Sequence, residues 1–213
     1  MEKTIKLEKT FRYFTYGNID TAENIWFVLH GYGQLPYYFI RKFQTLDPGK
    51  NFVVAPEGMH RFYLEGTSGR VGASWMTKEA RLDDINDNHN YLNQLATKIC
   101  NRKTFKKRFL LGFSQGGATA SRWHDSGSFN ADHFILWASV FPPDLEFNSK
   151  KSRLANSDNT FVVGKQDPFF KEKTDEVQDL FNKQDFSFKI VKYDGGHDID
   201  GEVLKKISQN LDS

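Results

Sequence analysis

The chain has 213 residues, enough for one domain with a full hydrophobic core. Its formal charge of +2 at pH 7 argues against a nucleic-acid partner or an anionic membrane surface. No apolar run approaches a signal peptide or a membrane span, and Cys100, the single cysteine, cannot form an internal disulfide. We therefore expect one cytoplasmic domain over residues 1–213 without stable membrane insertion. The composition does not indicate its oligomeric state.

In the first half of the chain, short apolar runs alternate with longer polar segments. An edge strand is predicted at 11–16, and the near-continuous apolar run at 25–30 is typical of a strand buried on both faces. A third strand at 52–55 stops at Pro56. The longest helix is predicted from 79 to about 101, because its apolar residues recur on one helical face.

The second half of the chain continues this alternation. Strands are predicted at 108–113, 133–138, 160–164 and 188–193, and helices at 116–124, 170–183 and 201–210. Alternating strands and helices predict an α/β fold, a mostly parallel central sheet with helices on both faces. Active sites in such sheets lie beyond the carboxyl ends of the strands, so the residues that follow each strand are the candidates for function.

Residues 112–116 read Gly-Phe-Ser-Gln-Gly and complete one of these strands. A strand, a sharp turn and a helix in that order present the serine at the turn as a nucleophile. Glycines two places before and after the serine let the strand and the helix pass closely. The pattern therefore favours Ser114 as a nucleophile over an ordinary turn serine.

Two further candidates follow later strands. Asp167 comes shortly after the strand at 160–164, and His197 comes after the strand at 188–193. The chain order serine, aspartate, histidine is that of the α/β-hydrolase triad. In this arrangement His197 takes the proton of the Ser114 hydroxyl, and Asp167 holds the imidazole in the useful tautomer.

Other acids and histidines compete for these roles. Asp194 and Asp198 are close to His197 in sequence, which disfavours them, and His30 ends a buried strand, where it is suited to brace the next loop. The remaining rivals are Asp158, Asp175, His60, His89, His124 and His133.

The negative oxygen of a tetrahedral intermediate needs preorganised donors. With a nucleophile of this kind they are the backbone N–H after the serine, here that of Gln115, and one from the loop after an early strand. The loop at 30–33 occupies that place, and we assign the second donor to the N–H of Tyr32.

The sequence resembles the carboxylesterase/phospholipase family of α/β hydrolases, which includes the acyl-protein thioesterases. The matching segments are His30–Gly33, Ala55-Pro56, Ser74-Trp75, Gly112–Gly117, Gly164–Pro168 and Gly195–His197. The resemblance implies an α/β-hydrolase fold without a large cap, a triad of Ser114, Asp167 and His197, oxyanion donors at Tyr32 and Gln115, and no cofactor. Gln34, Met76-Thr77 and residues 138–143 depart from the family pattern, which affects the predicted substrate rather than the triad.

Aromatic and apolar residues gather in the loops at the strand ends. We expect Trp75, Met76, Phe141 and Phe169 to contact the substrate in an apolar groove for a short or medium acyl chain. Three acids of the long helix, Asp83, Asp84 and Asp87, have no matching cluster elsewhere, so no metal site is expected.

The predicted function is hydrolysis of a small-molecule carboxylic ester, or a thioester, through an acyl-enzyme on Ser114. An acyltransferase, a peptidase and a dienelactone-type hydrolase are alternatives on the same triad. A binding module that keeps the serine turn without catalysis is an alternative from another class.

Overall fold

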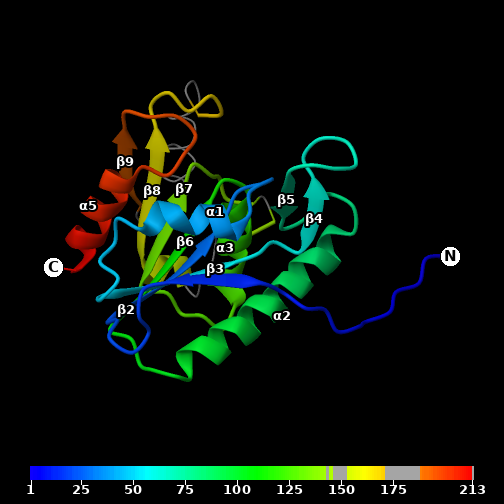
Figure 1. The fold of residues 1–213 in the computed structure, drawn as a ribbon, viewed down its shortest axis with the longest axis horizontal. Helices are drawn as coiled ribbons and strands as arrows, with labels where there is room; N and C mark the ends of the chain where they lie inside the picture. The colour runs from blue at the N-terminus through cyan, green and yellow to red at the C-terminus, as the bar shows by residue number, and fades with distance from the viewer. Residues whose placement is uncertain (143, 146–152, 171–187, 213) are drawn as a thin grey trace.

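A seven-stranded sheet runs through the centre of the described residues (Figure 1), in the order β1-β3-β2-β6-β7-β8-β9. The computed structural model describes residues 1–142, 144–145, 153–170 and 188–212. The strands are β1 (Tyr13–Tyr16), β2 (Asn24–Leu29), β3 (Asn51–Pro56), β6 (Lys107–Phe113), β7 (His133–Trp137), β8 (Asp158–Gly164) and β9 (Phe188–Tyr193). Only β1 runs antiparallel to its neighbour within this sheet, so the other six strands end at one edge.

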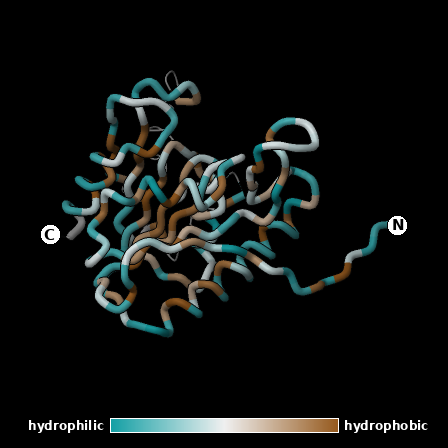
Figure 2. The backbone as a smooth tube through the Cα atoms, viewed as in Figure 1, coloured by the Kyte–Doolittle hydropathy of each residue, from teal (hydrophilic) through white to brown (hydrophobic). Residues whose placement is uncertain are grey.

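The central strands are buried because their sequences are apolar on both faces. All six residues of β2 are buried, as are all five of β7. Trp26 of β2 stacks on Phe109 of β6 with ring centroids 4.0 Å apart. The apolar segments gather in the middle of the molecule and the polar segments run around it (Figure 2). The predicted parallel sheet is therefore confirmed.

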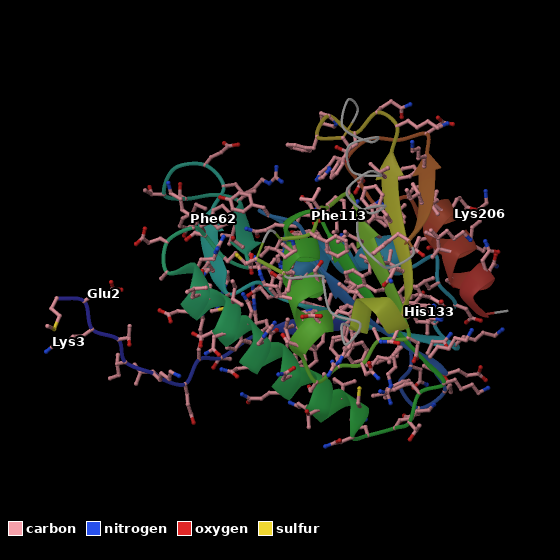
Figure 3. All side chains as sticks on the ribbon, turned by 180° about the vertical axis from the view of Figure 1, so that it is seen from behind. Glu2, Lys3, Phe62, Phe113, His133 and Lys206 are labelled. Atoms are coloured by element: carbon pink, nitrogen blue, oxygen red, sulfur yellow. The ribbon has the colours of Figure 1, made fainter. Side chains whose placement is uncertain are left out.

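Helices pack against the sheet at positions that the apolar periodicity predicts. The long helix is α2 (Arg81–Cys100), α3 (Gln115–Ser126) packs on β6, and α5 (Gly201–Asp212) follows β9. Seen from behind, α3 lies in front of the sheet (Figure 3). The 3₁₀ helix η1 (Ile40–Phe43) contacts both the short α1 (Pro36–Phe39) and α5. A second 3₁₀ helix, η2 (Arg153–Asn156), precedes β8.

Several details differ from the sequence predictions. A two-stranded hairpin of β4 (His60–Tyr63) and β5 (Val71–Ser74) was not predicted, because each strand has four residues and β4 is only partly buried. The strand predicted at 133–138 ends one residue early, where Ala138 takes a φ of 48°. Beyond its first residue, the predicted helix at 170–183 lies outside the described residues.

The described residues form no cap domain over the sheet. Among the helices that the structure describes, none is long and apolar enough to cross a bilayer.

Candidate active site

The turn between β6 and α3 holds Ser114 in a strained conformation. Its φ is 51°, in a region that residues with side chains rarely adopt. A Cβ on Gly112 would lie 2.5 Å from the Cα of Gly117, and one on Gly116 would overlap the carbonyl oxygen of Leu29. Gly112 thus allows β6 and α3 to approach closely, and Gly116 does the same for α3 and β2. Ser139 Oγ donates a hydrogen bond of 2.7 Å to the Ser114 carbonyl and holds the turn.

The three predicted triad side chains lie in one hydrogen-bonded series. Ser114 Oγ lies 3.0 Å from His197 Nε2, and His197 Nδ1 lies 2.7 Å from Asp167 Oδ2. Asp167 follows β8 and His197 follows β9. Because β6, β8 and β9 are parallel, their carboxyl ends bring the three residues to the same edge of the sheet.

Packing fixes the aspartate and the imidazole. The Asp167 side chain is fully buried, and its second oxygen, Oδ1, accepts a hydrogen bond of 2.9 Å from the Phe169 amide. The His197 ring lies 4.9 Å from the Phe113 ring and 4.8 Å from the Phe169 ring, between centroids. The His197 side chain is 21% exposed, so a substrate can reach it from solvent.

Several of the predicted rivals pair with other residues. Asp194 pairs with Lys165 and Asp198 pairs with Lys42. His60 pairs with Asp84, and His133 lies near Asp158. Asp175 lies outside the described residues.

His30 braces the loop that follows β2. Burial lowers the pKa of His30 to about 4, so its ring is neutral at pH 7. The Gly58 amide donates to His30 Nε2 at 2.9 Å, which leaves the proton on Nδ1 to be donated to the Gly31 carbonyl at 2.8 Å. The Gly31 amide in turn donates to Gln34 Oε1 at 2.9 Å. The backbone conformation of this loop is therefore fixed from both sides.

The two amides predicted as oxyanion donors flank the serine turn. Gln115 is the first residue of α3, where backbone N–H groups have no partner within the helix. Tyr32 follows Gly31, on which a Cβ would lie 3.2 Å from Ser114 Cβ. Within the residues that the structure describes, neither amide donates to a protein acceptor. Both N–H groups can therefore bind an oxygen of a ligand.

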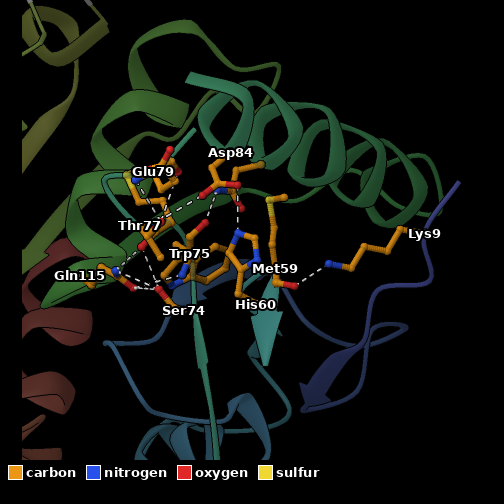
Figure 4. Close-up of polar contacts among 11 residues, drawn as sticks. Lys9, Met59, His60, Ser74, Trp75, Thr77, Glu79, Asp84 and Gln115 are labelled. Carbon is orange, nitrogen blue, oxygen red and sulfur yellow. Dashed lines mark hydrogen bonds and ion pairs between the residues drawn. The ribbon is translucent and has the colours of Figure 1, made fainter. Parts of the chain in front are cut away.

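The Gln115 side chain, unlike its backbone amide, forms structural hydrogen bonds that the sequence did not predict. Its Oε1 accepts from the Trp75 amide at 3.1 Å, and its Nε2 donates to the Met76 carbonyl at 2.9 Å (Figure 4). Ser74 Oγ lies 3.2 Å from Gln115 Oε1 and also donates to the Met76 carbonyl. The residue after Ser114 thus holds the chain in place where β5 ends.

A second group of contacts ties the same loop to α2. Asn88 Nδ2 donates to the Trp75 carbonyl at 2.8 Å. Asp84 accepts from the Thr77 amide at 3.3 Å and lies 2.9 Å from His60 Nε2 (Figure 4). The Asp84 carboxylate is thus a structural link on a helix face, a role that no sequence motif indicates.

Two of the four predicted substrate contacts are buried. Trp75 is fully buried, and its Nε1 donates to the His30 carbonyl at 2.8 Å, so this indole is part of the core rather than a substrate contact. Phe141 is also buried, with its ring 5.4 Å from that of Phe188. These two assignments are wrong, because both rings turn inward from the loops that carry them. Phe169 is 66% exposed beside His197 and stays a candidate contact.

Met76, the fourth predicted substrate contact, is intermediate in burial between the two buried rings and the exposed Phe169. Its side chain is half-buried, and its sulfur lies 3.7 Å from Arg122 Nη1. The Met76 backbone serves the Gln115 clamp. Among the described residues, no group of three or more His, Cys, Asp and Glu side chains is arranged to hold a metal ion.

No protein-family model and no curated protein matches the sequence. Solved structures do match, and they match over nearly the whole chain. Acyl-protein thioesterase 2 of Zea mays is 17% identical with a TM-score of 0.71, over 94% of this chain and 97% of that one. A carboxylesterase of Mesorhizobium loti is 15% identical with a TM-score of 0.71, over 93% and 94%. A carboxylesterase of Bacillus cereus is 16% identical with a TM-score of 0.68, over 95% and 93%.

The fold is that of the α/β hydrolases. In this α/β-hydrolase fold the serine turn after β6, the acid after β8 and the histidine after β9 stand in the chain order typical of the fold. The fold predicted from the sequence is therefore confirmed. A fold alone does not imply a reaction, so the assignment of a reaction depends on the geometry of the site.

Proposed function

We propose that this protein is a serine hydrolase that cleaves carboxylic esters or thioesters of small molecules, in the cytoplasm, through an acyl-enzyme on Ser114. The observation that carries the proposal is the series Ser114 Oγ, His197, Asp167, with hydrogen-bond distances of 3.0 and 2.7 Å. The turn holds Ser114 next to two amides that have no acceptor among the described residues, and acyl transfer needs such donors for its oxyanion.

In the first step Ser114 Oγ attacks the carbonyl carbon while its proton passes to His197 Nε2. The carbonyl π electrons move to oxygen, and the Tyr32 and Gln115 amides stabilise the resulting charge. The C–O or C–S bond then breaks. The leaving alcohol or thiol takes the proton from His197, and the acyl group stays on Ser114. Asp167 stabilises the imidazolium throughout without taking its proton.

In the second step a water molecule replaces the leaving group. His197 takes one proton of the water, and the oxygen attacks the acyl carbon. Collapse of the second tetrahedral intermediate breaks the bond to Ser114 Oγ, which recovers its proton from His197. The products are a carboxylic acid and the free enzyme, and the groups used are those of this chain and water.

Labelling with a fluorophosphonate tests whether Ser114 is activated. The wild type and the control Ser126→Ala should be labelled, and Ser114→Ala should not, because Ser126 lies at the end of α3 away from His197. Hydrolysis of p-nitrophenyl butyrate and of butyrylthiocholine then compares an ester with a thioester. A wild-type protein that takes no label and hydrolyses neither compound contradicts the proposal.

A further inference from the structure

A cavity of about 900 Å³ lies beside the loop that carries Tyr32. The loop at 33–35, the segment of α1 and η1, and the turn between β4 and β5 form its walls. This volume is in the range of pockets that hold small molecules, roughly 300–1,000 Å³. Neither Ser114 nor His197 lines the cavity, so it is a separate space next to the candidate active site.

The lining of this cavity is cationic. Arg41 and Lys42 contribute from η1, and Arg70 contributes from the turn before β5, whereas none of the lining residues is acidic. Lys42 is neutralised by Asp198, with an N–O distance of 2.6 Å. Within the described part of the chain, neither Arg41 nor Arg70 forms an ion pair with a carboxylate. Two positive charges thus line one space without a carboxylate partner among the described residues.

Arg41 is held in place by aromatic rings. Its guanidinium carbon lies 4.5 Å from the Tyr37 ring centroid and 5.2 Å from that of Tyr38. Such cation–π contacts fix the planar group while its N–H donors stay available. Tyr38 lines the cavity together with apolar residues such as Leu64 and Val71. The space therefore combines an apolar wall with an arginine whose position is set in advance.

The cavity and the candidate active site share one piece of backbone. Gly31 lies against Ser114, and Gly33, two residues later, lines the cavity. Two residues span at most about 7 Å. The Gly33 amide donates to the Ala73 carbonyl at 2.9 Å, which joins this loop to β5 and so to the hairpin that carries Arg70. One wall of the cavity is thus only two residues away from the glycine that lies against Ser114.

We propose that this cavity receives an anionic part of the substrate, a carboxylate or a phosphate, and that Arg41 and Arg70 bind it. The inference rests on the proposed function and specifies its substrate class: an ester or thioester with an acidic group a few atoms from the scissile carbonyl. Arginine suits this role because its donors match carboxylate and phosphate oxygens in pairs.

A matched pair of substrates tests the proposal. The mono-p-nitrophenyl ester of adipic acid and p-nitrophenyl hexanoate have the same carbon chain and leaving group and differ in the terminal carboxylate. We expect kcat/KM to be at least tenfold higher for the adipate ester, mostly through KM. The ratio should fall with added salt, since both arginines are exposed and salt screens exposed charges. Equal values, or a preference for hexanoate, contradict the proposal.

Variants then assign the effect to the two arginines. In Arg41→Met/Arg70→Met the ratio of the two kcat/KM values should fall at least fivefold. Arg41→Lys should keep part of it, because the charge remains. The control is Arg102→Met, which removes an exposed arginine beyond the end of α2 and should leave the ratio and the unfolding temperature unchanged. A double variant with the wild-type ratio contradicts the proposal.

Two inhibitors distinguish the anionic groups. Free adipate and butyl phosphate compete with p-nitrophenyl hexanoate if the cavity binds their oxygens, and the stronger inhibitor identifies the preferred group. Absence of competition by both contradicts the proposal. Fluorophosphonate labelling of Ser114 in the same samples separates this result from a failure of the proposed hydrolase activity.

Discussion

Asp167 Oδ2 lies 2.7 Å from His197 Nδ1 while the Asp167 side chain is fully buried. A buried carboxylate in this position fixes the imidazole tautomer that leaves Nε2 free to accept the Ser114 proton. We expect Asp167→Asn to lower kcat for ester hydrolysis on the order of 10⁴-fold with little change in the fold, because the amide can stabilise the wrong tautomer. Steady-state kinetics with circular dichroism checks this. Near-wild-type kcat would show that Asp167 has no catalytic role.

His197→Ala removes the imidazole that lies 3.0 Å from Ser114 Oγ and that we propose as the base. The expected loss of kcat is at least about 10³-fold, since triad members act as a unit. Asp167→Asn/His197→Ala should be hardly slower than His197→Ala alone. A mild effect of His197→Ala means that another base takes the proton.

Gln115→Ala tests the clamp on the chain at the end of β5. The backbone amide of residue 115 remains, so oxyanion binding is affected only through the position of the loop. We expect kcat to fall about tenfold at nearly constant KM, and the free energy of unfolding to fall by roughly 1–2 kcal/mol, because the Trp75 amide and the Met76 carbonyl lose a partner. Gln115→Glu keeps the acceptor for the Trp75 amide, so its kcat and its free energy of unfolding should lie between those of the wild type and of Gln115→Ala. A change in KM alone argues for direct substrate contact instead.

The close approach of α3 to β2 predicts a difference between two glycines. A Cβ on Gly116 would overlap the Leu29 carbonyl oxygen, whereas a Cβ on Gly196 meets nothing within 4 Å. Gly116→Ala should therefore lower the free energy of unfolding by roughly 1–3 kcal/mol. Gly196→Ala should change it by less than about 0.5 kcal/mol. Urea denaturation of both variants measures this, and equal effects would contradict the packing described for the serine turn.

Two buried histidines predict how stability depends on pH. Burial lowers the pKa values of His30 and His124 to about 4, below the value of 6.5 expected for an unfolded chain. The unfolded chain therefore binds more protons between these pH values, and stability falls as pH drops from 6.5 towards 4. Each histidine contributes a slope of about 1.4 kcal/mol per pH unit in that window and none above pH 7.

His124→Gln separates the two contributions. The variant should show a shallower decline of unfolding free energy between pH 6.5 and 4.5 than the wild type, with His30 still contributing. Denaturant titrations at four pH values in this window check the slopes. An unchanged slope in the variant contradicts a depressed pKa at His124.

The core of the fold could be predicted because its residues are apolar on every face. The runs that form β2 and β7 bury completely, which only interior strands of a parallel sheet do. The same topology made the site predictable. Ser114, Asp167 and His197 each follow a strand, and parallel strands bring those ends together. Their catalytic role stays a prediction until it is measured.

The parts that could not be predicted depend on contacts between distant segments. Trp75 follows a strand, as a pocket residue does, and only the structure shows its indole turned inward onto the His30 carbonyl. The β4–β5 hairpin is short and partly exposed, so its sequence carries little signal. Arg41 and Arg70 belong to separate elements, and nothing in either segment indicates that they face one cavity.

The positive φ of Ser114 has a consequence for how this sequence can change over evolutionary time. A residue with a side chain in such a conformation costs about 1–3 kcal/mol, and glycine would adopt it with little strain. A chain released from the need for a nucleophile would gain stability by exchanging this serine for glycine, through a change at a single codon. Under the proposed function, the serine at position 114 is therefore kept at a cost in folding stability.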